Sequence, residues 1–134
     1  MATQKARFEY LLTENNLTIH EKEQFEHYLI AIDTVNRKLL YLNFSSEKED
    51  IKVIDLQKTK TARVDVEENS IYEDKKGKSV FVEKHIMKLQ LELTPKDAKQ
   101  LLPFYQYQDG MGDYNRLKNR IEYWRNNINN FVGV

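Results

Sequence analysis

The segment YLIAIDTVNRKLLYLNF, residues 28–44, contains two apolar runs separated by a polar stretch. In the first run, Tyr28, Ile30 and Ile32 fall on one face of an extended chain, because side chains alternate between faces along a strand. The polar stretch, 33–38, then reverses the chain, so the segment predicts a β-hairpin. Both strands are apolar on both faces, and we therefore expect one face to lie on the core and the other to be partly covered.

Outward from this hairpin, each end of the chain has the apolar spacing of a helix. Residues 4–13 place Phe8, Leu11 and Leu12 on one helical face, which predicts a short N-terminal helix. Asp113 is a suitable N-cap for a second, longer helix, and Gly133 a suitable stop. The stripe of this second helix recurs at spacings of three and four and consists of Tyr114, Leu117, Ile121, Trp124, Ile128 and Phe131.

The chain between the hairpin and the C-terminal helix predicts further antiparallel strands. Apolar residues at 51–56 and alternation at 62–66 indicate one or two half-exposed strands, followed by a long hairpin closed near Gly77. The return strand has the cleanest two-residue period, at 87–93. After it, Thr94 and Pro95 begin either a helix or a turn into a strand around 102–107; Pro103 would interrupt that helix and favours the turn.

These elements predict an α+β fold in one domain spanning residues 1–134, a length typical of a single core. The expected parts are an N-terminal helix and loop over 1–20, antiparallel strands over 28–107 and a C-terminal helix over 113–131. The helix is expected to pack its stripe onto an antiparallel sheet or across the mouth of a barrel.

Composition excludes several classes of protein. The chain has 21 Lys+Arg and 21 Asp+Glu, so it lacks the basic surplus of a nucleic-acid-binding protein. Its hydrophobic content of 40% is too high for intrinsic disorder. The longest apolar run, 29–32, is far too short to span a bilayer. The absence of cysteine excludes disulfides and thiolate chemistry and fits a reducing compartment, so we expect a cytoplasmic protein.

Several motifs resemble those of uncharacterised bacterial proteins with a pleckstrin-homology-like (PH-like) domain. These are the hairpin LIAIDTVNRKLLYL at 29–42, VIDL at 53–56 before a basic strand, KLQLEL at 88–93, and a final helix carrying Trp124 and Ile128-Asn129. The resemblance implies a strongly bent antiparallel sheet or barrel of PH-like type, with one open end closed by the C-terminal helix. It also implies a binding or interaction module, although no phosphoinositide-binding motif is recognisable. The resemblance adds the alternative that the chain is the soluble part of a membrane-attached protein.

Catalytic and metal motifs are not recognisable in the sequence. His20 and His27 lie among glutamates in a segment that we interpret as solvated and acidic, because it matches no metal motif. No serine lies in a nucleophile-elbow pattern. The Gly-x-Gly at 110–112 lacks the further residues of a phosphate-binding loop and is interpreted as a flexible connection. We therefore predict no catalytic residue, no metal and no cofactor.

A basic cluster is the best functional candidate. It consists of Lys58, Lys60, Arg63, Lys75, Lys76 and Lys78. If the hairpin near Gly77 folds over, these charges share one side and can meet an acidic protein or anionic lipid. Interleaved acidic residues make a plain solvated surface the competing interpretation.

Aromatic residues divide into core and surface candidates. Trp124 lies in the helical stripe, so we expect it in the core. Tyr41, Tyr105 and Tyr123 lie off the best stripes, and we expect them to form an exposed patch for a partner.

The sequence thus favours a non-catalytic protein-interaction or regulatory module that uses an exposed strand edge or the basic hairpin. Peripheral binding to anionic membrane lipid through the basic cluster is the first alternative. A small enzyme is the second, and it would require histidine, glutamate and serine side chains converging in a pocket.

Overall fold

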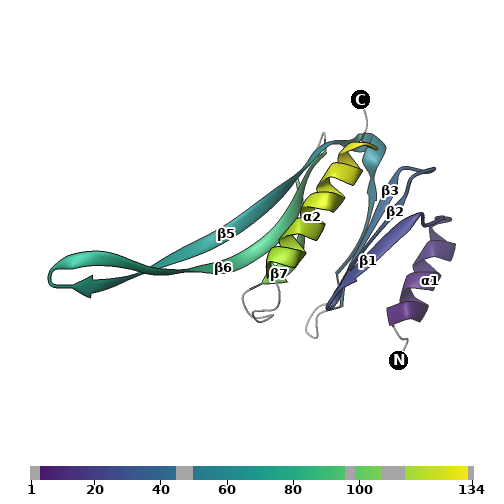
Figure 1. The fold of residues 1–134 in the computed structure, drawn as a ribbon. Coiled ribbons are helices and arrows are strands. Elements are labelled where there is room, and N and C mark those ends of the chain that lie inside the picture. The colour runs from purple at the N-terminus through teal and green to yellow at the C-terminus, as the bar shows by residue number, and fades with distance from the viewer. Residues whose placement is uncertain (1–3, 45–49, 96–98, 107–113, 133–134) are drawn as a thin grey trace. The chain divides into compact units, whose positions relative to one another are not determined.

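The computed structural model describes residues 4–44, 50–95, 99–106 and 114–132. The chain divides into two compact units, Met1–Lys60 with Ile128–Val134, and Thr61–Asn127. Along the chain, α1 comes first, the described strands follow one another, and α2 comes last, which is an α+β order (Figure 1).

The first unit contains one helix and a four-stranded antiparallel sheet in the order β1-β2-β3-β4. Its elements are α1 (Gln4–Glu14), β1 (Glu21–Phe25), β2 (Tyr28–Asp33), β3 (Lys38–Asn43) and β4 (Asp50–Asp55). The central pair is in the register expected for a hairpin, with Ile30 opposite Tyr41 and Asp33 opposite Lys38.

α1 lies against one face of this sheet (Figure 1). Phe8 and Leu11 of α1 join Leu29, Ala31 and Leu40 in one apolar cluster, as the helical spacing predicts. β2 is buried at every position, so its residues on the face away from α1 are buried as well. The prediction that both faces of this hairpin are covered is confirmed.

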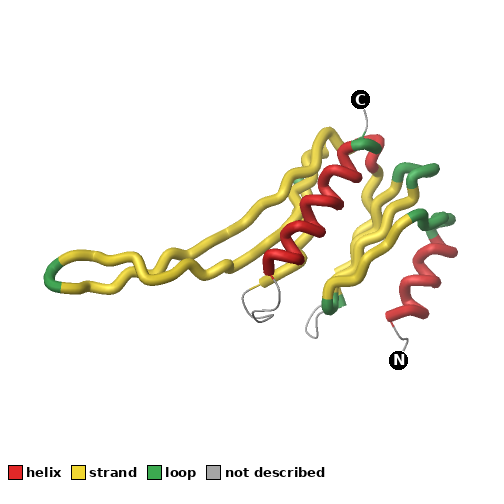
Figure 2. The backbone as a smooth tube through the Cα atoms, in the orientation of Figure 1, coloured by secondary structure: helices red, strands yellow, loops and turns green. Residues whose placement is uncertain are grey.

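The second unit contains a three-stranded antiparallel sheet in the order β5-β6-β7 and most of the C-terminal helix. Its elements are β5 (Thr59–Lys75), β6 (Lys78–Pro95), β7 (Gln100–Gln106) and α2 (Tyr114–Asn129), and the short 3-10 helix η1 (Leu56–Lys58) leads into β5. β5 and β6 are the two longest of the described strands, and they form the long hairpin seen in Figure 2.

Both helices and the late strand agree with the sequence-based predictions. α2 buries Ile121, Trp124 and Ile128 of the predicted stripe. β7 forms where a turn followed by a strand was favoured over a helix. The proposed N-cap Asp113 and stop Gly133, and the Gly-x-Gly at 110–112, lie outside the described residues.

Two expectations about the sheet need correction. The described strands do not close into a barrel, because they form two separate sheets whose edge strands remain open. The chain leaves the first sheet through η1, and β5 then pairs with β6 instead of β4. β1 was also missed: its sequence EKEQF was interpreted as a solvated acidic segment, yet it pairs along its whole length with β2.

Within the described residues, no helix is both long and apolar enough to cross a membrane.

Candidate functional site

The β5–β6 hairpin extends beyond the part of its sheet that β7 covers (Figure 1). β7 pairs with β6 only between Lys88 and Leu93. We call the remaining outer part of this hairpin, residues 67–87, the arm. It has two strands and no third strand beside it among the described residues, and its residues 67–82 are exposed except for the half-buried Ile71.

A two-residue turn closes the arm. Lys76 and Gly77 both have positive φ, 53° and 78°, which is the backbone of a type I′ turn. Lys75 and Lys78 flank this turn and therefore face each other across the two strands. Counting back from them places Tyr72 opposite Phe81, and these rings do pack edge to face with centroids 5.9 Å apart.

The arm exposes large apolar side chains. Tyr72 is 59% exposed, Val80 41%, Phe81 50% and Val82 45%. Val80 and Val82 share one face of β6 and Phe81 lies on the other, because successive side chains of a strand alternate. The apolar surface is therefore present on both faces of the arm, and Tyr72 and Phe81 are of the aromatic type that is enriched in protein interfaces.

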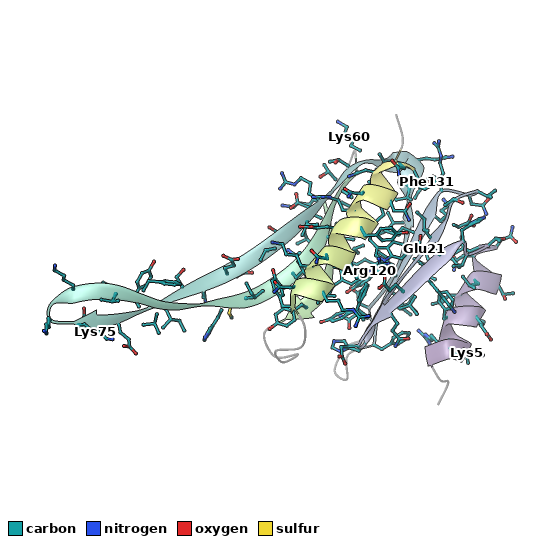
Figure 3. All side chains as sticks on the ribbon, in the orientation of Figure 1. Lys5, Glu21, Lys60, Lys75, Arg120 and Phe131 are labelled. Carbon is teal, nitrogen blue, oxygen red and sulfur yellow. The ribbon has the colours of Figure 1, made fainter. Side chains whose placement is uncertain are left out.

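The basic cluster predicted from the sequence is split along β5. Lys75, Lys76 and Lys78 gather at the tip of the arm, whereas Arg63 lies twelve positions before Lys75 on the same strand. At about 3.3 Å per residue that separation is about 40 Å. Figure 3 likewise shows Lys60 and Lys75 at opposite ends of β5.

The charges at the two ends of β5 also have different environments. Arg63 forms an ion pair of 3.5 Å with Glu92, which lies 3.5 Å from Lys99 as well. Lys75 lies 4.0 Å from Glu73 with both side chains largely exposed, and such a surface pair contributes little stability. Lys58 and Lys60 are exposed at the start of the strand. Of the six residues of the basic cluster, only the three lysines at the tip of the arm form a compact group.

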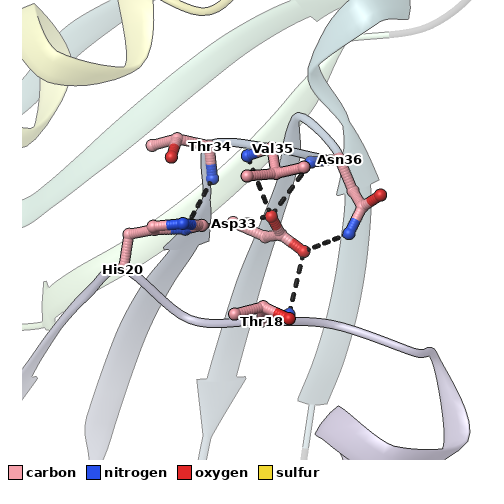
Figure 4. A network of polar contacts seen from close by, with 6 residues as sticks. All are labelled: Thr18, His20, Asp33, Thr34, Val35 and Asn36. Carbon is pink, nitrogen blue, oxygen red and sulfur yellow. Dashed lines mark hydrogen bonds and ion pairs between the residues drawn. The ribbon is translucent and has the colours of Figure 1, made fainter.

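A second polar site lies in the first unit, around the buried carboxylate of Asp33 (Figure 4). Its Oδ1 accepts hydrogen bonds from the backbone N–H groups of Val35 and Asn36, at 3.0 and 2.9 Å. Its Oδ2 accepts from the Thr18 N–H at 2.9 Å and from the Asn36 side-chain amide at 2.6 Å. Four donors occupy the roughly four acceptor positions of a carboxylate, so the group has little capacity left for a ligand.

This carboxylate titrates below the ordinary range. Burial raises the pKa of Asp33, but the hydrogen bonds from Asn36, Thr18 and Val35 favour the ionised form and together lower the pKa. His20 Nδ1 lies 3.9 Å from Asp33 and accepts a hydrogen bond of 3.1 Å from the Thr34 N–H. The network joins the segment before β1 to the β2–β3 turn, so its role is structural.

The other candidate residues are placed as follows. Trp124 is buried, as expected, and Tyr123 is exposed. The expectation that Tyr41 and Tyr105 are exposed is wrong, since both are buried. In the described part of the chain, no three histidine, aspartate or glutamate side chains are grouped so as to hold a metal ion.

Sequence reasoning missed the apolar residues of the arm. The available signal was the run Val80-Phe81-Val82 directly after a lysine-rich turn, where an ordinary exposed hairpin carries polar residues. Asp33 was also missed, although an aspartate ending an apolar strand, with asparagine three residues later, is typical of a side-chain-capped turn.

Comparison with protein-family models, with curated proteins and with solved structures finds no match to this chain.

Proposed function

We propose that the protein is a non-catalytic interaction module of PH-like type, acting in the cytoplasm, that binds another protein through its arm. The observation that carries this proposal is the exposed apolar set of the arm, Tyr72, Val80, Phe81 and Val82. Aromatic side chains on a projecting surface are the usual anchors of protein contacts, because they bury large areas with few rotatable bonds. The order of antiparallel strands followed by a C-terminal helix supports the PH-like type.

The proposal is tested by placing a photoreactive benzoylphenylalanine at position 81 and irradiating the protein in an extract of its native host. We expect discrete protein adducts, whose yield falls when Tyr72→Ser is added, because Tyr72 packs against the ring at position 81. The matched control carries the same photoreactive residue at Tyr10 of α1, which is 63% exposed. A yield at position 81 no higher than at position 10 would contradict the proposal.

Binding to anionic lipid is a second candidate, favoured by the three lysines at the tip of the arm. Each lysine near an anionic surface contributes about 1 kcal/mol. Co-sedimentation with phosphatidylserine vesicles, compared with neutral vesicles, tests this candidate. Salt-sensitive binding that the triple Lys75→Glu, Lys76→Glu, Lys78→Glu variant loses, and that Lys58→Glu, Lys60→Glu retains, supports it. No sedimentation with either vesicle excludes it.

A further inference from the structure

The outer edge of β5 is open along the arm. β5 is the first strand in the order β5-β6-β7, and no strand among those described pairs with its other side. Lys75 and Lys78 close the two-residue turn and direct their N–H and C=O groups at each other. Because this direction alternates along a strand, Ser70, Tyr72 and Asp74 direct theirs outward.

Open edges of this length are normally protected by charges or bulges. Here the charges of β5 lie on either side of an uncharged centre, Ser70-Ile71-Tyr72. The flanking residues Glu73 and Asp74 are acidic and Lys75 is basic. This arrangement leaves a short central segment able to accept another strand, and its charges restrict which strand fits.

We propose that the partner is a second copy of this chain, whose β5 pairs antiparallel with β5 along the outer edge about a two-fold axis at Tyr72. This inference rests on the proposed function and names the occupant of the arm. A two-fold axis between antiparallel strands stands perpendicular to the sheet, so one residue must lie opposite its own copy. The possible registers are therefore few and can be compared by charge.

Among the registers centred on residues 71–73, only the one centred on Tyr72 places no two like charges opposite each other. Centring on Ile71 places Asp74 opposite Glu68 of the second copy, and centring on Glu73 places two copies of Glu73 together. Centring on Tyr72 places Glu73 opposite Ile71, Asp74 opposite Ser70 and Lys75 opposite Asn69 of the second copy. Like charges directly opposite each other destabilise a sheet, so the Tyr72 register is preferred.

The same register also joins the aromatic residues of the two arms. Tyr72 and Phe81 lie on one face of the arm, as their ring contact shows. The two-fold axis brings the Tyr72 rings of both copies side by side on that face, with one Phe81 on each outer side. Four neighbouring aromatic rings form a continuous row, and aromatic cross-strand pairs are among the most favourable in sheets.

The register is tested by single cysteines, because the chain has none of its own. In the proposed pairing, Tyr72→Cys brings two Cα atoms to about 5.5 Å, within the range of a disulfide. Glu73→Cys separates its two copies by about 8 Å and Asp74→Cys by about 14 Å, both too far. Because Tyr72→Cys also removes an aromatic ring, the variants are compared at concentrations where sedimentation shows each to be dimeric. There we expect mild oxidation to give a covalent dimer from Tyr72→Cys much faster than from either control. Equal or faster dimer formation by either control overturns the register.

Association itself is tested by sedimentation of the full chain without cysteine. We expect a concentration-dependent dimer, and we expect Tyr72→Asp to raise its dissociation constant about 100-fold or more, since a central aromatic anchor is lost and two like charges meet. Tyr10→Asp is the matched control with similar exposure and leaves the dimer unchanged. A wild-type chain that stays monomeric overturns the proposal.

The two proposals fail in distinguishable ways. Photoadducts at position 81 that contain only other proteins retain an interaction module but overturn the second copy as occupant. Adducts that join two copies of the chain support both the interaction module and the second copy as its partner. An adduct yield at position 81 that is no higher than at the control position, Tyr10, contradicts both proposals.

Discussion

Asp33 ends β2 and accepts four hydrogen bonds, three from Val35 and Asn36 within the β2–β3 turn and one from Thr18 in the segment before β1. A buried carboxylate is costly unless its charge is compensated, and here backbone N–H groups provide that compensation. The turn and the carboxylate therefore stabilise each other.

Asp33→Ala removes the acceptor and leaves its donors without their partner. We expect the free energy of unfolding to fall by about 3 kcal/mol, because a buried donor without a partner costs about 1 to 3 kcal/mol. Urea unfolding followed by circular dichroism measures this loss. The control is Asp50→Ala, which removes a partly exposed ion pair with Lys52 and is expected to cost less than about 1 kcal/mol. Equal losses in both variants would contradict the structural role of Asp33.

The same carboxylate gives a defined pH dependence. Its pKa is lowered in the folded state, so its stabilisation is complete above the pKa of the unfolded chain, about 3.9. That stabilisation is lost as the pH falls through the lower folded pKa. Wild type compared with Asp33→Asn, by urea midpoints from pH 7 to pH 2, is expected to show a constant advantage above about pH 4 that shrinks below it. An advantage that does not change at low pH would show that Asp33 is not the titrating group.

Among the elements, β1 and the arm each have a feature that the local sequence pattern does not predict. β1 has a single apolar residue, Phe25, so no periodicity marks it; the neighbouring β2 supplies the hydrogen-bonding edge that makes it a strand. The arm was predicted as a hairpin near Gly77, but which of its residues lie beyond β7 depends on where the β6–β7 pairing stops. Both outcomes depend on partners distant from the local pattern.

The turn of the arm gives the prediction at this scale. Gly77 has φ of +78° and nothing within 4 Å of the position a Cβ would take, so Gly77→Ala acts through backbone strain alone. We expect the arm to open more easily by about 1 kcal/mol, or roughly five-fold faster amide exchange.

Lys76→Asn is the matched variant, because asparagine before glycine is the preferred type I′ pair. We expect Lys76→Asn to slow amide exchange in the part of the arm around Tyr72 and Phe81, where Gly77→Ala is expected to accelerate it. Amides of β2 are expected to be unaffected by either change. Faster exchange in Lys76→Asn would contradict the assigned turn.

At the scale of the whole molecule, the single domain expected from the length of the chain stays a prediction, and the two compact units give a way to test it. Trp124 is the only tryptophan and lies in the second unit, whereas Phe8 lies in the core of the first. Phe8→Ala is expected to lower stability by about 3 to 4 kcal/mol through the cavity it leaves.

If the chain unfolds as one domain, Phe8→Ala lowers the urea midpoint of Trp124 fluorescence as much as that of circular dichroism. We expect this result. Tyr10→Ala, on the exposed side of α1, is the control and is expected to change neither midpoint appreciably. A fluorescence midpoint that stays at the wild-type value while circular dichroism shifts would identify two independently folding units.

Sequence patterns predict the α+β class, both terminal helices, the first hairpin, the turn at Gly77 and the burial of Trp124. These features follow from local periodicity and turn chemistry, which act within a few residues. Tertiary pairing places the strands in two open sheets and buries Tyr41 and Tyr105. It also splits the basic cluster and leaves the apolar residues of the arm exposed. Strand pairing and burial depend on residues far apart in the chain, and a local sequence pattern does not specify which of these residues come into contact.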